Sequence, residues 1–409
     1  MHNSHSTRTL SSTDFELVDE NGRVYGNTTF YMPCDEAEQD RLTIQHQVFV
    51  YALKGKLTTT PLPDTRCRVL DLCTGPGNWA VAVAQQFPKA EVVGVDMAVW
   101  DIETTEADGG GGGVTWEIDD LDIWGVESEM DSLTSRLERY DPFLDPTVRN
   151  PARKNTTKSP NSHPQSGTET SFPSSPSYNL DTLDPDEQPG WHFSHPFDLI
   201  HVRNCKGIFA YWEDVYAEIY KNLAPGGWVE VCDFELLLPE MINAPTGPSS
   251  PHLSHDHLTH TGGPSQTGTV PLPTIRKLYL SMMEASFKSG RPLGTYYLHP
   301  TYLEDAGFKD VRTTYVNVPV GQWPRDPEQK KIGKMFLVVV IESFESNLMR
   351  LLTRWGDKEK VWTSDEVMVE VERGKKEILD WTEGMEDEGN GAVWCANFKW
   401  VVGRKSKNA

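Results

Sequence analysis

The chain has 409 residues, of which 24% are charged and 37% hydrophobic, a balance typical of a folded globular protein. Lys and Arg number 38 against 60 Asp and Glu, so the net charge is −22, which repels phosphate and argues against nucleic acid as a partner. No apolar run is long enough for a membrane span or shaped like a secretory signal, so we expect no membrane association and a cytoplasmic location. The six cysteines are scattered, as is typical of reduced thiols.

The first 65 residues form a polar lead-in to the fold. Residues 1–25 are predicted to be a disordered tail. A helix is then expected to begin near Asp35, with Glu36 and Glu38 at its positive end and an apolar face that includes Leu42, Phe49 and Leu53. We expect this helix to pack on the core of the domain.

From residue 66 onward the pattern alternates between strands and helices. CRVLDLC, AEVVGVDM, VTWEI, HPFDLIHVRN and GWVEVCDFEL read as strands, and WAVAVAQQF and DVYAEIYKNL read as helices between them. Strand, helix and strand in close succession imply right-handed crossovers and parallel pairing. The sequence therefore predicts an α/β fold with a doubly wound, mostly parallel Rossmann-like sheet, as one domain over 26–409 with its core at 66–240.

Two segments interrupt this domain. Residues 130–192 and 244–270 are rich in Pro, Ser, Thr and Gly, so we predict that both are disordered insertions. The second contains His252, His255, His257 and His260, but no strand or helix fixes their geometry, and we predict no metal site. The remainder, 272–409, reads as helices, a strand at VRTTYVNVPV and a closing strand at AVWCANFKWVVGRK, and is expected to supply a helical lid over an acceptor.

The most informative segment is a glycine loop between the first strand and its helix. Asp71 ends the strand, Gly75 and Gly77 allow a tight turn, and the following helix presents free N–H groups. Asp96 ends the next strand, where a carboxylate can accept hydrogen bonds from both hydroxyls of a ribose. Together these features predict a nucleoside-containing cofactor.

Two cofactor classes fit such a loop: a dinucleotide and S-adenosylmethionine. A pyrophosphate requires the helix N-terminus to be free of negative charge, which disfavours it beside Asp71. The ammonium and sulfonium of S-adenosylmethionine suit that carboxylate. Asp119 and Asp120 follow the third strand and can accept from the adenine amine, so acids at three strand ends favour the methyl donor.

These motifs resemble a known family. DLCTGPG, VVGVDM, EIDD, FDLIHVRN and LAPGGWVEV, in this order, resemble a class I S-adenosylmethionine-dependent methyltransferase, and YMPCDEAEQDRLTIQHQVF, GRPLG, AGF and VPVGQWPRD resemble the LaeA-like fungal methyltransferases. The resemblance implies one set of cofactor-binding residues: Asp71, Gly75 and Gly77 at the methionine half, Asp96 at the ribose, Asp119 and Asp120 at the adenine, and Arg203 and Asn204 on the floor near the methionine. Cys73 stands where the family usually has Gly, which implies a different loop backbone or weaker cofactor affinity.

The catalytic groups stay open at this level. The sulfonium supplies the leaving group, so alignment of the acceptor is the main task of the protein. An acidic acceptor would need a general base, for which His46, His201, Tyr31 and Glu235 are candidates that the sequence does not separate. Cys205 and Cys232, near strand ends, are not expected to act as nucleophiles, because the donor already carries an activated methyl group and needs no covalent relay.

Three functions compete. The first is methylation of a small-molecule natural product in fungal secondary metabolism. The second is a nuclear, LaeA-like regulator that acts through protein partners or protein methylation, for which the basic GRKSKN segment would be a localisation signal. The third is a non-catalytic binding module, which the departure at Cys73 keeps open.

Overall fold

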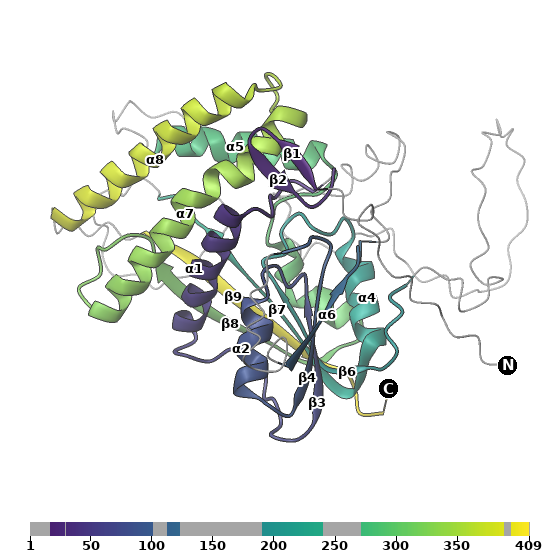
Figure 1. The fold of residues 1–409 in the computed structure, drawn as a ribbon. Coiled ribbons are helices and arrows are strands. Elements are labelled where there is room, and N and C mark those ends of the chain that lie inside the picture. Colours follow the sequence, from purple (N-terminus) through teal and green to yellow (C-terminus); the bar gives the residue numbers. More distant parts are fainter. Residues whose placement is uncertain are drawn as a thin grey trace, which may run out of the picture.

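The computed structural model describes residues 17–28, 30–100, 113–122, 190–239, 271–387 and 394–408 (Figure 1). Its centre is a seven-stranded sheet in the order β5-β4-β3-β6-β7-β9-β8, in which β9 is antiparallel to both neighbours and the other strands are parallel to one another. The strands are β3 (Cys67–Leu72), β4 (Ala90–Asp96), β5 (Val114–Ile118), β6 (Phe197–Arg203), β7 (Leu223–Leu236), β8 (Lys309–Pro319) and β9 (Cys395–Arg404). This arrangement confirms the predicted doubly wound, mostly parallel sheet.

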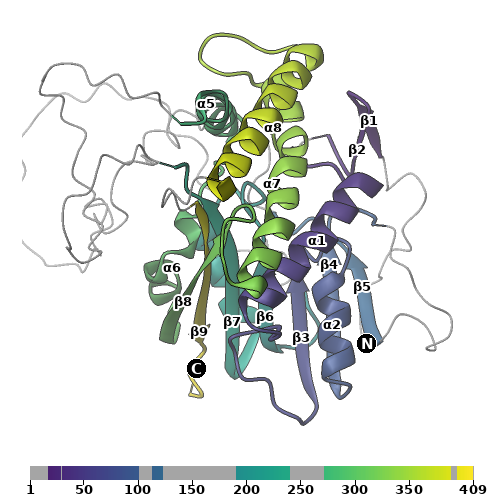
Figure 2. The same ribbon diagram turned by 90° about the vertical axis from the view of Figure 1, so that its left-hand side faces the viewer.

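Helices cover both faces of the sheet (Figures 1 and 2). One face carries α1 (Glu36–Ala52), α2 (Asn78–Gln86) and α7 (Pro327–Arg354), and the other carries α4 (Trp212–Asn222) and α6 (Pro300–Asp305), which is preceded by the short 3-10 turn η6 (Tyr296–Leu298). Two more helices, α5 (Pro273–Lys288) and α8 (Ser364–Asp387), pack against α7. Apolar clusters fill the space between the helices and the sheet, and a further cluster lies among α5, α7 and α8.

The chain positions these elements through local signals. In β3 every residue except Arg68 is buried, as expected for a parallel strand covered on both faces. Asp35 caps the N-terminus of α1, where its carboxylate accepts from the Glu38 N–H, and Asp326 caps α7, where its carboxylate accepts from the Gln329 N–H. The predicted start of α1 is therefore confirmed.

The prediction of a disordered tail through residue 25 is wrong for its last part. Residues Val18–Glu20 and Arg23–Tyr25 form an antiparallel hairpin, β1 and β2. Arg350 of α7 holds it, because its fully buried guanidinium lies 2.8 Å from Glu20 and 3.4 Å above the Tyr25 ring. The sequence does not predict this hairpin, because Arg350, which stabilises it, lies more than 300 residues away along the chain.

The predicted insertion 130–192 extends too far at its end. Trp191 is buried in the core, where its backbone N–H donates to Glu218 and its indole N–H to the Leu121 carbonyl. Residues 130–189 and the whole of 244–270, with the four histidines at 252–260, lie outside the described residues. None of the helices within the described ranges combines the length and apolarity that a membrane crossing requires.

Candidate functional site

The glycine loop joins β3 to α2 at the carboxyl edge of the sheet. Gly75 and Gly77 have φ of 58° and 78°, in the left-handed region that side chains disfavour. A Cβ on Gly77 would lie 2.4 Å from the Trp116 ring, so this position also has no room for a side chain. Both glycines are required by the turn, as predicted from their spacing.

Asp96, at the end of β4, closes the loop from the neighbouring strand. Its Oδ2 accepts from the Gly75 N–H at 2.8 Å and its Oδ1 from the Ala98 N–H at 2.9 Å. Burial raises the pKa of this carboxyl, while the two backbone N–H groups oppose that shift. The carboxylate is thus fixed beside the loop with lone pairs left for further donors.

Asp71 lies on the opposite side of the loop and is almost fully buried. The His201 ring nitrogen Nδ1 lies 2.9 Å from its Oδ1, and the Thr74 hydroxyl donates to its Oδ2 at 2.6 Å. The carboxylate therefore stabilises the turn through its hydrogen bond with Thr74 and also lines a cavity.

Cys73 adopts the left-handed backbone of a glycine, with φ of 56°. Its hydrogen bond with Cys205, then burial, raises the pKa of its thiol well above 9.0. The side chain packs against the core cluster on the α4 face of the sheet. The departure from the family pattern is thus accommodated without loss of the turn.

Arg203 is the last residue of β6, and Asn204 follows it. The Arg203 Nη1 lies 3.2 Å from His46 Nδ1, and its guanidinium stacks over the Phe49 ring. Asn204 has φ of 60°, and its buried Oδ1 has no hydrogen-bond partner among the described residues. Both residues line the same cavity as Asp71 and Asp96.

The structure does not bring Asp119 and Asp120 to this cavity wall. Both are exposed after β5, and neither is among the lining residues of the described chain. The Asp120 carboxylate instead accepts from the Asp122 N–H, which makes it a turn residue here. Their assignment to the adenine therefore stays a prediction from the sequence, and this geometry gives it no support.

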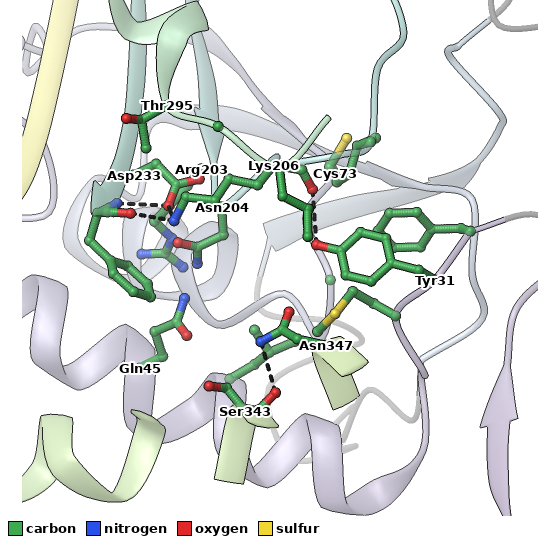
Figure 3. A pocket seen from close by; sticks show the side chains of 18 of the residues that line it. Tyr31, Gln45, Cys73, Arg203, Asn204, Lys206, Asp233, Thr295, Ser343 and Asn347 are labelled. Atoms are coloured by element: carbon green, nitrogen blue, oxygen red, sulfur yellow. Dashed lines mark hydrogen bonds and ion pairs between the residues drawn. The ribbon is translucent and has the colours of Figure 1, made fainter. Parts of the chain in front are cut away.

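The cavity has a volume of about 1800 Å³ and extends from the glycine loop toward the helices above the sheet. Residues 26–27 and 30–34 and helices α1, α5 and α7 supply much of the walls, which the sequence analysis largely missed. Figure 3 shows Tyr31, Gln45 and Asn347 among them. Gln45, Ser343 and Asn347 belong to these helices, whereas Lys206, Asp233 and Thr295 line the cavity from β7 and the loops at this edge of the sheet. The sequence points to two of the wall residues, Tyr31 and Glu235, as base candidates. A further signal is Lys206, which follows Arg203 and Asn204 in HVRNCK.

One ion pair dominates the wall near β7. Asp233 is almost fully buried, lies 2.6 Å from the Lys206 ammonium and accepts from the Tyr297 hydroxyl at 2.5 Å. The Tyr31 hydroxyl donates to the Lys206 carbonyl at 3.2 Å. The charges of this wall are therefore internally compensated, and its polar groups are held in place.

Comparison with known proteins agrees with this geometry. A family described as a methyltransferase domain matches residues 44–283, more than half of the chain, including the glycine loop and β4 to β7. The chain belongs to this methyltransferase family. The match confirms the predicted enzyme class and, with it, S-adenosylmethionine as the methyl donor.

Several curated relatives of this methyltransferase are fungal proteins. It is 26% identical to the secondary metabolism regulator LAE1 of Cochliobolus heterostrophus, over 82% of this chain and 81% of that protein. It is 23% identical to the methyltransferase pytC of Aspergillus terreus, over 89% of this chain and 83% of the relative. The protein-methionine methyltransferase laeA of Emericella nidulans is 25% identical, over 81% of this chain and 64% of its own length. These similarities confirm the predicted resemblance to LaeA-like proteins.

The residues of this methyltransferase fit S-adenosylmethionine. The Oδ1 of Asn204, which has no hydrogen-bond partner among the described residues, can accept a hydrogen bond from an ammonium group. Each oxygen of the Asp71 carboxylate accepts one hydrogen bond within the protein and retains a lone pair for the ligand. Asp96 is placed one strand away, as a ribose would require. We therefore retain Asp71, Gly75, Gly77, Asp96, Arg203 and Asn204 as the proposed cofactor residues.

The structure separates the four base candidates of the methyltransferase. His46 and His201 are buried and do not line the large cavity. Tyr31 lines it, but burial raises the pKa of its hydroxyl far above the ordinary value of 10. Glu235 is exposed on the cavity wall, where its carboxylate accepts from the Thr295 hydroxyl at 3.5 Å. Glu235 alone of the four combines access with a basic group.

His46 should instead make the stability of the methyltransferase depend on pH. Burial and then the Arg203 charge lower the pKa of His46 from 6.5 to about 3. Between these two values the unfolded chain binds a proton that the folded chain does not, so the free energy of unfolding falls as the pH is lowered from 6.5 toward 3. The contribution of this residue is at most about 1.4 kcal/mol per pH unit.

Urea denaturation of the wild type and of His46→Gln across this range checks the prediction. The variant should show the shallower dependence of unfolding free energy on pH. His195→Gln, at an exposed position, controls for the loss of an imidazole. Equal slopes for the wild type and His46→Gln would contradict the assignment.

Proposed function

We propose that this methyltransferase transfers a methyl group from S-adenosylmethionine to a small-molecule natural product in fungal secondary metabolism. The observation that carries the proposal is the large cavity, which begins at Asp71 and Asp96 and continues under α5 and α7. Its volume of about 1800 Å³ exceeds the range of roughly 300–1000 Å³ that is usual for a single ligand site. The donor and a second molecule therefore have room side by side.

In this proposal the residues of the chain bind the methyl donor and the acceptor and orient them toward each other. The donor supplies an activated methyl group when bound, so the protein has to align the acceptor and exclude water. Residues 30–34 and α7 line the cavity, and the polar groups of Gln45, Asn347 and Thr295 face it from different elements (Figure 3). These groups can fix the orientation of an acceptor whose body lies against Phe234 and Phe344.

Binding and transfer can be measured separately. Calorimetry with S-adenosylmethionine tests the donor site, and incubation of the protein with labelled donor and fungal metabolite extracts tests the acceptor. Label in a low-molecular-weight product is the expected result. Tight donor binding with label only in protein would contradict the small-molecule acceptor while preserving the donor site.

For an acceptor hydroxyl or acid, Glu235 is our proposed general base. Glu235→Gln keeps the shape of the side chain but removes the basic oxygen, so we expect kcat to fall about 100-fold. The dissociation constant of S-adenosylmethionine should stay within about twofold of the wild type, since Glu235 lies away from the glycine loop. Glu284→Gln, at another acid of the cavity wall, is the matched control and should retain activity. An unchanged kcat in Glu235→Gln would exclude this role.

A protein acceptor is the second candidate, because two of the relatives are named as a regulator and as a protein-methionine methyltransferase. In that case the protein would act in the nucleus, through partners or through methylation of itself. The acids Glu213, Asp214, Glu304 and Asp305 on the α4 and α6 side of the cavity would then receive a basic segment. Mass spectrometry of the protein after incubation with labelled donor would detect self-methylation.

A further inference from the structure

Three ionisable side chains form one row across the centre of the sheet. Asp71 of β3 is the register partner of His201 on β6, and His201 is the register partner of Glu230 on β7. All three are at most 3% exposed. Such a row is costly to bury unless its members satisfy one another, so it calls for an explanation.

The imidazole of His201 lies between the two carboxylates, hydrogen-bonds to Asp71, and has Cys232 Sγ at 3.7 Å from its Nε2. Its Nδ1 lies 2.9 Å from Asp71 Oδ1, and its Nε2 lies 3.9 Å from Glu230 Oε1. Trp79 of α2 stacks on the ring at 3.6 Å with an interplanar angle of 5°, which fixes its plane. The imidazole is therefore held in two ways: the stack with Trp79 fixes the plane of its ring, and the hydrogen bond with Asp71 fixes the direction of its Nδ1.

The far end of the row is anchored away from the cavity. Glu230 Oε2 accepts from the Thr59 N–H at 2.7 Å and from the Thr59 hydroxyl at 2.5 Å. Its Oε1 has no hydrogen-bond partner among the described residues and faces His201. Of the three members only Asp71 lines the large cavity, so a change at His201 reaches the cavity through Asp71.

We propose that His201 is a positioning residue that fixes the Asp71 carboxylate for the methionine half of the donor. Its Nδ1–H donates to Oδ1 while the Thr74 hydroxyl donates to Oδ2, so the carboxylate plane is set from both sides and its remaining lone pairs are directed to the cavity. The proposal rests on the function proposed above, because it concerns the same cofactor site.

Three replacements of His201 separate positioning from packing. In His201→Asn the amide can place a donor where Nδ1 lies, whereas in His201→Gln it extends toward the Nε2 position. His201→Phe keeps a ring for the stack with Trp79 but has no donor. Calorimetry should give a dissociation constant for S-adenosylmethionine within about threefold of the wild type for Asn, and at least about tenfold weaker for Gln and Phe.

A purely structural role predicts the reverse order, with Phe closest to the wild type because the ring stack is preserved. Thermal unfolding of each variant shows whether it is folded. If His201→Phe does not fold, the comparison of His201→Asn with His201→Gln still decides between the two roles. Asn and Gln of equal affinity would overturn the proposal. A wild type that does not bind the donor would instead overturn the proposed function, and this inference with it.

A double-mutant cycle with Asp71 supplies the second readout. If His201 acts through Asp71, His201→Gln should weaken donor binding no further once Asp71→Asn is present. Additive losses in the double variant would mean that His201 acts by another route, and would overturn the proposal.

Discussion

Arg350→Met is expected to destabilise the folded protein by about 3 kcal/mol, because it removes the buried charge that organises the N-terminal hairpin. The Arg350 guanidinium pairs with Glu20 and donates to the carbonyls of Asn27 and Phe30 at 2.8 and 2.6 Å. Methionine retains much of the volume but none of the donors. Urea denaturation monitored by tryptophan fluorescence measures the loss.

The adjacent Arg354 offers a matched control. It pairs with the same Glu20, but its side chain is 32% exposed. Exposed pairs contribute about 1 kcal/mol or less, so Arg354→Met should be much milder. Equal losses in the two variants would show that burial of Arg350 is not what stabilises the hairpin.

Asp96→Ala is expected to weaken S-adenosylmethionine binding by about 100-fold or more. Hydrogen bonds to a charged group contribute about 1.5–3 kcal/mol each, and a ribose offers two hydroxyls to this carboxylate. The variant also removes the acceptors of the Gly75 and Ala98 N–H groups, so the loop itself loosens. Calorimetry gives the affinity, and thermal unfolding shows whether the fold is retained.

In the same calorimetric experiment, Asp120→Ala tests whether Asp120 contributes to binding of the adenine of S-adenosylmethionine. Because Asp120 is exposed and does not line the cavity, its replacement should change affinity by about threefold or less. A loss as large as that of Asp96→Ala would restore Asp120 to the direct cofactor contacts. A donor affinity unaffected by Asp96→Ala would contradict the ribose assignment.

The central strands and the glycine loop were predictable because their signals are local. Asp71, Gly75, Gly77 and Asp96 lie within one strand-loop-helix-strand unit, whose spacing is set by backbone geometry. The hairpin at 18–25 was not predictable, since its strands are three residues long and are held by a distant arginine.

The base candidates show the same limit. His46 and Glu235 are equally plausible in the sequence, but the packing of Arg203 against α1 buries the former and the course of β7 exposes the latter. The acceptor walls come from residues 30–34, the end of β7 and helices α5 and α7, which no single motif connects. Sequence therefore predicts the donor half of the site far better than the acceptor half.

The order of the strands also constrains how the chain can be shortened. The family match ends at residue 283, but β7 pairs with β9 from Trp228 to Leu236, and β9 lies beyond residue 394. A chain cut at 283 would leave β7 as an unprotected edge whose free N–H and C=O groups recruit other chains. We expect such a fragment to aggregate, so the matched region is a unit of homology but not a unit of folding.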